Sequence, residues 1–116
     1  MRAAGMPEGE SILGNIDDGL KVIVEEGVAK LPDRTAFAGS VATADRLVRS
    51  MVFLADVPLL DAIHMITATP ARILGALEKK GTLVAGKDAD IVLFDSNINI
   101  EMTIVKGRIV YNKCEN

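Results

Sequence analysis

The chain has 116 residues, of which 49% are hydrophobic and 25% are charged, a composition typical of one globular domain and not of a disordered chain. The net charge is −3 and no basic block occurs, so we expect neither nucleic acid nor a membrane as a partner. The chain has one cysteine and no signal-peptide core, and no apolar run reaches the ~18 residues of a membrane span. We therefore expect a cytoplasmic location.

The single histidine, His64, limits the catalytic chemistry open to this chain. A metal hydrolase normally gathers several His, Asp or Glu ligands around its ion, and this chain cannot supply a histidine cluster. A Cys–His or Ser–His–Asp arrangement would have to use His64. We therefore expect no metal ligand and no catalytic residue in this chain.

The first forty residues have the pattern of short strands and turns. Residues 5–11, GMPEGES, predict a loop because they combine two glycines, a proline and acidic residues. Apolar residues between two glycines predict a strand over residues 20–25, a turn at Glu26-Gly27 and a returning strand over 28–31. A further turn is expected at LPDRT, residues 31–35.

The middle of the chain predicts three helices. Ser40 is the expected N-cap of the first helix, which should end near Asp56 because Pro58 disfavours the helical conformation of the residue before it. Pro58 suits the first turn of a second helix. Thr69 and Pro70 are expected to be the cap and first residue of a third, short helix.

The last third of the chain predicts β-structure. The apolar run between Asp90 and Asp95 is typical of a buried strand, and Lys106-Gly107 is the expected turn of a hairpin. The order of elements is therefore a β-hairpin, then helices, then a β-meander, which defines an α+β fold class.

Three groups of residues have both a functional and a structural interpretation. His64 has Asp61 as its only acidic partner at helical spacing, and a surface or half-buried histidine is the simpler interpretation. Asp88, Asp90 and Asp95 resemble the start of a calcium loop but lack its glycine and terminal glutamate, so we expect Asp88 and Asp90 to lie in a turn and hold backbone N–H groups.

The Gly39-Ser40 pair at an expected helix start could bind an anion through backbone N–H groups, although a plain N-cap is the default interpretation. Cys114 lies two residues from the end of the sequence, and its neighbours give no argument for a reactive thiol. Residue types alone therefore assign no chemistry to either position.

Three separated segments together resemble a known family. GKDADIVLFD, residues 86–95, resembles the C-terminal signature of the amidohydrolase superfamily. AGSVATADRLVR, residues 38–49, and MRAAGMPEGESILG, residues 1–14, resemble N-acetylglucosamine-6-phosphate deacetylases within it. The matches occur in the family's order and cover essentially the whole chain.

The resemblance implies that the chain is the C-terminal portion of a longer deacetylase. The family fold is a (β/α)8 barrel with a small β-sandwich. Residues 1–80 would then be the last part of the barrel, including a hairpin excursion, and residues 81–116 would be the C-terminal strands of the sandwich. The family's metal ligands and its acid/base aspartate would lie upstream of residue 1.

The resemblance also implies the chemistry of the parent enzyme. A divalent metal of the zinc or iron type activates water, which hydrolyses N-acetylglucosamine 6-phosphate to glucosamine 6-phosphate and acetate. Phe37, Ala38 and Gly39 match residues that lie beside the substrate, so they are the expected substrate-binding residues. Phe37 stands where leucine is common and Ala44 where methionine is common, and one extra residue precedes the Ala-Gly-Ser run. We expect this chain alone to bind no metal and to be inactive.

Two alternatives stay open at this point. The chain could be a non-catalytic α+β module that self-associates, because strands without their partners leave exposed edges that favour homo-oligomers. It could also be a portion of another amidohydrolase, although the Ala-Gly-Ser segment argues for a deacetylase.

Overall fold

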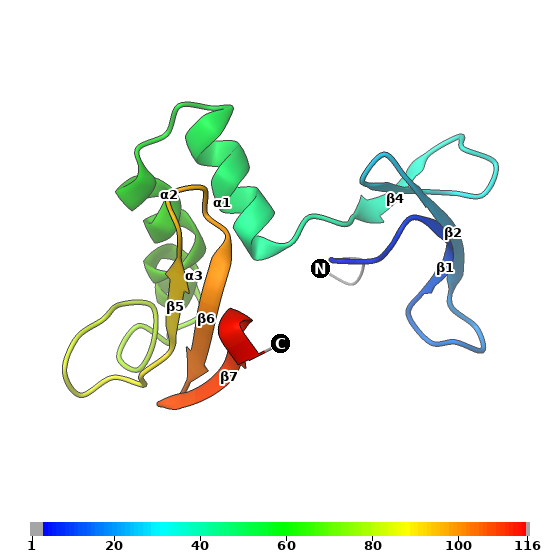
Figure 1. The fold of residues 1–116 in the computed structure, drawn as a ribbon. Helices are drawn as coiled ribbons and strands as arrows, with labels where there is room; N and C mark the ends of the chain where they lie inside the picture. The colour runs from blue at the N-terminus through cyan, green and yellow to red at the C-terminus, as the bar shows by residue number, and fades with distance from the viewer. Residues whose placement is uncertain (1–3, 116) are drawn as a thin grey trace. The chain divides into compact units, whose positions relative to one another are not determined.

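The computed structural model describes residues 4–115, which form two compact units (Figure 1). Unit 1 extends to Thr43 and unit 2 begins at Ala44. Unit 1 contains only strands, whereas unit 2 contains helices followed by strands, so the α+β class is confirmed. The expected boundary near residue 80 concerns the parts of a parent fold and stays a prediction.

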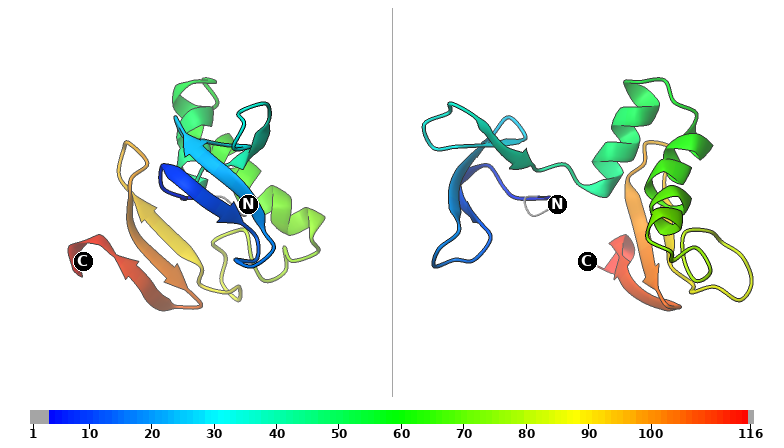
Figure 2. Two further views of the ribbon diagram at one scale, coloured as in Figure 1. Left: turned by 90° about the vertical axis from the view of Figure 1, so that its right-hand side faces the viewer. Right: turned by 180° about the vertical axis from the view of Figure 1, so that it is seen from behind.

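Unit 1 is a four-stranded antiparallel sheet in which each strand pairs with the next along the chain (Figure 2). The bounds are β1 (Gly9–Leu13), β2 (Leu20–Glu25), β3 (Val28–Lys30) and β4 (Phe37–Ser40). The strand over 20–25 and the Glu26-Gly27 turn were predicted correctly, because both depend on local residue types. Glu26 and Gly27 both have positive φ, at 54° and 72°, as the tight turn between β2 and β3 requires.

Two predictions for this region were wrong. Residues 9–11 belong to β1, where a loop was expected, because β1 pairs with β2 along its whole length. Ser40 is the last residue of β4 and not a helix cap, because β4 pairs with β3 and the first helix begins only at Ala44. The Ser40 hydroxyl instead accepts a hydrogen bond from the Ala42 N–H at 3.2 Å.

The core of unit 1 is small and aliphatic. Its main cluster is Val24, Ala29 and Val41, against which Met6, Leu13 and Ala38 pack, and Val22 of β2 is buried as well. Ala29 has 0% of its surface exposed, so β3 is anchored through the side chain of its central residue. A one-residue slip of β3 would turn this side chain outward, because strand side chains alternate between faces.

Unit 2 contains three helices followed by a three-stranded antiparallel sheet. The helices are α1 (Ala44–Phe53), α2 (Leu59–Ile66) and α3 (Ala68–Ile73). The sheet has the order β5 (Ile91–Phe94), β6 (Ile100–Val105) and β7 (Arg108–Asn112), and the 3-10 turn η1 (Lys113–Glu115) follows. The predicted hairpin turn at Lys106-Gly107 is confirmed, with positive φ at both residues.

The third helix begins two residues earlier than predicted. Thr67 separates α2 from α3, with φ −122° and ψ −82°, and its hydroxyl donates a hydrogen bond to the Ile63 carbonyl at 2.6 Å. Pro70 is the third residue of α3, inside the first turn, where a residue needs no N–H donor. The helix therefore begins at Ala68 although Thr69 has the residue type of a cap.

The strand between Asp90 and Asp95 is present, but its predicted burial is wrong. Val92 and Leu93 are both about half exposed in the described residues. The reason is the position of β5 at the edge of the sheet, where only β6 pairs with it. An apolar run therefore indicated the strand correctly but not what covers it.

The core of unit 2 joins α1 and α2 to the sheet. Val48, Ala62 and Ile98 are buried together, and Phe94 packs against them. Ile98 has a φ of 61°, a conformation that β-branched residues rarely adopt, although only 3% of its surface is exposed. Its burial in the core offsets the cost of this conformation.

Arg49 of α1 fixes the loop that carries Ile98. Its guanidinium donates to the Ile98 carbonyl at 3.0 Å and to Asn99 Oδ1 at 3.2 Å, and it also pairs with Asp45 one turn earlier on the helix. The carboxylate of Asp95 accepts the Asn99 N–H at 2.9 Å on the other side of the loop. The loop is thus held by side chains from both of its flanks.

We predict that Ile98→Ala lowers the free energy of unfolding of unit 2 by about 2–4 kcal/mol, because it leaves a cavity between α1, α2 and the sheet. Urea unfolding followed by helical circular dichroism measures this change, since the described helices all lie in unit 2. Ile73→Ala is the matched control, because Ile73 is 79% exposed and its truncation should change stability by at most about 0.5 kcal/mol. Equal midpoints for the two variants would contradict the prediction.

Candidate functional site

Strand β4 carries all three residues that the sequence selects as a substrate-binding wall. Its pairing with β3 sets Gly39 opposite Ala29 and Phe37 opposite Lys30, and the register shift between Ala29 and Lys30 leaves Ala38 without an opposite residue. This is a β-bulge, a feature that changes the direction of neighbouring side chains and is common beside active sites.

The bulge gives the three residues different environments. Phe37 is 78% exposed, so its ring is free to form an apolar wall. Ala38 packs against the core of unit 1, and Gly39 is half-buried beside Ala29. The structure therefore brings the three residues together on one strand, and of their side chains only the Phe37 ring is largely exposed.

A surface hollow of about 470 Å³ lies beside Phe37. Its polar lining comes from Lys30, Arg34 and Thr35, together with Glu26. These residues did not stand out in the sequence, where they are ordinary hairpin and turn residues. The turn over residues 31–35, which the sequence does predict, is the signal that places Lys30 close to the residues after that turn, and Lys30 lies opposite Phe37.

The cations beside this hollow are already paired with one carboxylate. Arg34 donates to both oxygens of Glu25, with Nη2 at 2.5 Å and Nε at 3.1 and 3.2 Å, and Lys30 Nζ lies 3.7 Å from the same group. The hydrogen bond from Arg34 is the largest cause of the lowered pKa of Glu25. The hollow is thus close to electrically balanced, and an anion would have to compete with Glu25.

The turn before β4 is closed by Asp33. This carboxylate accepts hydrogen bonds from the Thr35 N–H at 3.0 Å and from the Thr35 hydroxyl at 2.8 Å. The backbone hydrogen bond, followed by the hydroxyl bond, lowers the pKa of Asp33. The expected turn over residues 31–35 is confirmed, and Asp33 has a structural role there.

His64 is exposed on α2 and borders a different hollow, of about 390 Å³, within unit 2. The lining of this hollow is mostly apolar, with Thr67, Thr82 and Asp90 as its other polar side chains. Among residues 4–115, no hydrogen bond or ion pair reaches the His64 imidazole. The interpretation as a surface histidine therefore agrees with the structure.

Asp90 holds a backbone N–H group, as predicted, and so does Asp95. The Asp88 carboxylate instead forms an ion pair with Lys80, which also pairs with Asp90. Asp90 accepts the Lys106 N–H at 2.8 Å. Lys80 Nζ lies 2.5 Å from Asp90 and 2.9 Å from Asp88. Asp95 accepts the N–H groups of Asn97 and Asn99, both at 2.9 Å.

These arrangements do not provide a metal centre. Within residues 4–115, no group of three or more His, Cys, Asp or Glu side chains could hold a metal ion. Cys114 is exposed and has no disulfide partner, since it is the only cysteine of the sequence. In the same part of the chain, none of the helices has the length and apolar character needed to cross a membrane.

Comparison with known proteins defines the family. Residues 29–111 match the amidohydrolase family, and the chain belongs to it. It is 38% identical over 97% of its length to an N-acetylglucosamine-6-phosphate deacetylase of Vibrio furnissii and covers 27% of that protein. It is 37% identical over 94% of its length to a putative N-acetylgalactosamine-6-phosphate deacetylase of Escherichia coli K12 and covers 62% of that protein.

Solved structures give the same result. The crystal structure of N-acetylglucosamine-6-phosphate deacetylase from Pasteurella multocida superposes with a TM-score of 0.82 at 25% identity. The match covers 95% of this chain and 28% of that structure. The resemblance to these deacetylases is therefore confirmed, and the chain spans about a quarter of the length of the Vibrio relative and of this structure.

We predict that Lys80→Met raises the pKa of Asp90. That pKa is lowered first by the hydrogen bond from Lys80 and second by the Lys106 N–H, and the variant removes the larger cause. A pH titration of the carboxyl ¹³C shift measures the change. Lys79→Met is the matched control, because Lys79 is the adjacent lysine and its ammonium contacts neither aspartate in the described residues. An unchanged Asp90 titration in Lys80→Met would contradict the assigned cause.

The sign of the accompanying pH dependence follows from this pKa. The pKa of Asp90 is lower in the folded chain than in an unfolded one, so its stabilising contribution is complete above about pH 5. The contribution is lost as the pH falls through the folded-state value. Lys80→Met should therefore be less sensitive to acid than the parent chain between about pH 4 and the folded-state pKa.

Proposed function

We propose that this chain is the C-terminal portion of an N-acetylglucosamine-6-phosphate deacetylase. The activity of the whole protein would be hydrolysis of N-acetylglucosamine 6-phosphate to glucosamine 6-phosphate and acetate. The observation that carries the proposal is the extent of similarity, because proteins named as such deacetylases match 94–97% of this chain at up to 39% identity.

The same proposal assigns parts of a larger fold. Residues 1–80 would belong to the last part of a barrel and residues 81–116 to the C-terminal strands of a small sandwich. The three-stranded sheet β5-β6-β7 supports this, since it follows the helices and ends in a hairpin near the end of the sequence. The four-stranded sheet of unit 1 would be the excursion from the barrel.

Strand β4 would contribute to the sugar site of the whole enzyme. Phe37 would provide an apolar wall, and Ala38 and Gly39 would let the substrate approach the backbone closely. The exposed ring of Phe37 and the bulge at Ala38 support this assignment. The paired charges of Glu25 and Arg34 beside the hollow argue against this strand as the phosphate site.

The divalent metal implied by the family does not fit the residues of this chain. Among residues 4–115, no group of three or more His, Cys, Asp or Glu side chains could hold a metal ion, and His64 is exposed on α2. A zinc-type or iron-type ion would need ligands from residues outside this sequence. We assign no step of the reaction to the residues that are present.

A second substrate is favoured by a specific observation. The relatives named as N-acetylgalactosamine-6-phosphate deacetylases are 37% identical to this chain. The N-acetylglucosamine-6-phosphate deacetylase of Vibrio furnissii is 38% identical to it, which is nearly the same. The two sugars differ only in the orientation of one hydroxyl group. Both sugar phosphates therefore belong in any assay of the whole enzyme.

The non-catalytic alternative is a self-associating module. The edge strand β5 has exposed apolar side chains and no second pairing partner among the described strands, which favours pairing between copies of the chain. A homo-oligomer in sedimentation at high concentration would support this alternative, and a monomer would count against it.

We predict that the purified 116-residue chain releases no acetate from either sugar phosphate, with or without added zinc, because its described residues, 4–115, contain no metal ligand set. A coupled acetate assay measures this. The positive control is the Vibrio furnissii relative under the same conditions. Zinc-dependent turnover by the short chain would overturn this prediction.

We predict that a chimera regains activity when residues 4–115 replace the matching region of the Vibrio furnissii relative. In this chimera, Phe37→Ala should raise the KM for N-acetylglucosamine 6-phosphate about tenfold, the effect of ~1.4 kcal/mol of lost contact. Ile16→Ala is the matched control, because Ile16 is equally exposed in the same unit but lies away from β4. Equal KM values for the two variants would remove Phe37 from the proposed site.

A further inference from the structure

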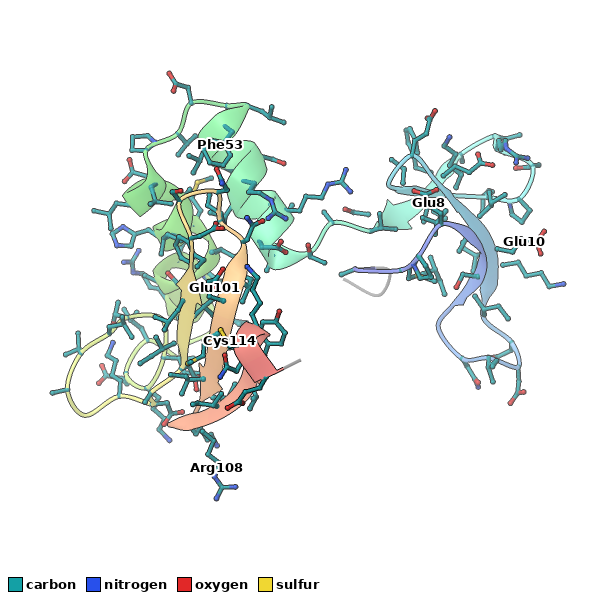
Figure 3. The ribbon with its side chains drawn as sticks, in the orientation of Figure 1. Glu8, Glu10, Phe53, Glu101, Arg108 and Cys114 are labelled. Carbon is teal, nitrogen blue, oxygen red and sulfur yellow. The ribbon has the colours of Figure 1, made fainter. Side chains whose placement is uncertain are left out.

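The carboxylate of Glu8 binds the turn that connects β2 to β3. Its Oε2 accepts the Glu26 N–H at 3.1 Å and its Oε1 accepts the Gly27 N–H at 3.0 Å. Figure 3 shows Glu8 and Glu10 on unit 1. Among the described residues, the Glu10 side chain makes no hydrogen bond to this turn. Glu8 is therefore an exposed residue with two long-range contacts, separated by 18 and 19 residues in sequence.

The turn needs an external partner of this kind. Glu26 has a φ of 54°, which costs free energy for a residue with a side chain. Two hydrogen bonds to an anion offset this cost, because charge-assisted bonds are stronger than neutral ones. A carboxylate can accept both N–H groups at once, whereas a glutamine side chain has only one acceptor oxygen.

The segment before β1 has two further contacts with the same sheet. Met6 packs against the core formed by Val24, Ala29 and Val41. The Gly5 N–H donates to the Val41 carbonyl at 3.0 Å, one residue after β4 ends. Residues 5–8 thus contact both the turn that begins β3 and the residue that follows β4.

Strand β3 is too short to define its own position. It has three residues, and its register with β4 determines both the burial of Ala29 and the exposure of Phe37. The turn at one end of β3 is therefore the natural place to fix the register. Glu8 is the side chain that holds this turn.

We propose that Glu8 is a positioning residue for the candidate sugar-contacting strand β4. By accepting the N–H groups of Glu26 and Gly27, it fixes the turn, the register of β3 and, through β3, the bulge that presents Phe37. The inference rests on the proposed function only for the role of β4 in sugar binding. The link from Glu8 to β4 is a property of unit 1 itself.

The test compares Glu8→Gln with Glu10→Gln in the ¹⁵N-labelled 116-residue chain. Glu8→Gln keeps the shape of the side chain but loses one acceptor, so amide hydrogen exchange at Gly39 and Leu31 should become about tenfold faster. The Leu31 N–H is a useful probe, because it bonds the Ala36 carbonyl at 2.9 Å within the β3–β4 connection. Amides of unit 2 serve as the internal reference and should not change.

A conservative variant separates positioning from simple packing. Glu8→Asp keeps both carboxylate oxygens and should exchange within about threefold of the parent chain at both probes. The inference is overturned if Glu8→Gln behaves like Glu10→Gln, or if Glu8→Asp exchanges as fast as Glu8→Gln. Either result would show that the carboxylate does not hold the strand.

A titration with N-acetylglucosamine 6-phosphate distinguishes failure of the proposed function from failure of the inference about Glu8. Both proposals are supported if the sugar phosphate shifts the amide signals of residues 37–39 in the parent chain and Glu8→Gln raises the apparent Kd at least about threefold. Faster exchange in Glu8→Gln without any ligand shift in the parent chain would support Glu8 as the residue that holds β4. That result would count against the sugar-binding role of β4.

Discussion

The pairing of β3 with β4 is the constraint on which the candidate site depends. Ala29 is the central residue of a three-residue strand and is fully buried, so its side chain determines which way every neighbour faces. If β3 moved by one residue, Ala29 would enter solvent and the partner strand would lose the bulge at Ala38. The exposed ring of Phe37 is thus a consequence of a buried methyl group on the neighbouring strand.

In unit 2, a different interaction fixes the register of the strands. Its sheet has a single neighbour for β5, so the register of β5 depends on the loop that joins it to β6. Asp95 and Arg49 hold that loop, and the burial of Ile98 maintains a backbone conformation that its side chain disfavours. Each unit therefore has a small core and polar side chains that hold one connection between paired strands. These side chains are Glu8 in unit 1 and Arg49 and Asp95 in unit 2.

The parts of the fold that the sequence predicted correctly depend on local residue types. The turns at residues 26–27 and 106–107, the strand over 20–25 and the strand between Asp90 and Asp95 all have their signals within a few residues. The start of α1 and the strand β1 were missed because pairing with a distant strand decided them. Glu8, Arg34 and Lys80 were not predicted as functional or structural contacts, because side-chain pairs across turns leave no spacing pattern in the sequence.

The hydrogen bond from Arg49 to the Ile98 carbonyl also affects the order of folding. It joins residues separated by 49 positions, whereas the hairpin of β6 and β7 closes over two residues. Short loops close faster than long ones, so the hairpin can form while the loop at Ile98 is still open. During synthesis, α1 leaves the ribosome well before β5, and until β5 is made its apolar face can pack only on α2, where Val48 contacts Ala62. We therefore expect the core of unit 2 to be completed late, when the loop that carries Ile98 reaches α1 and α2.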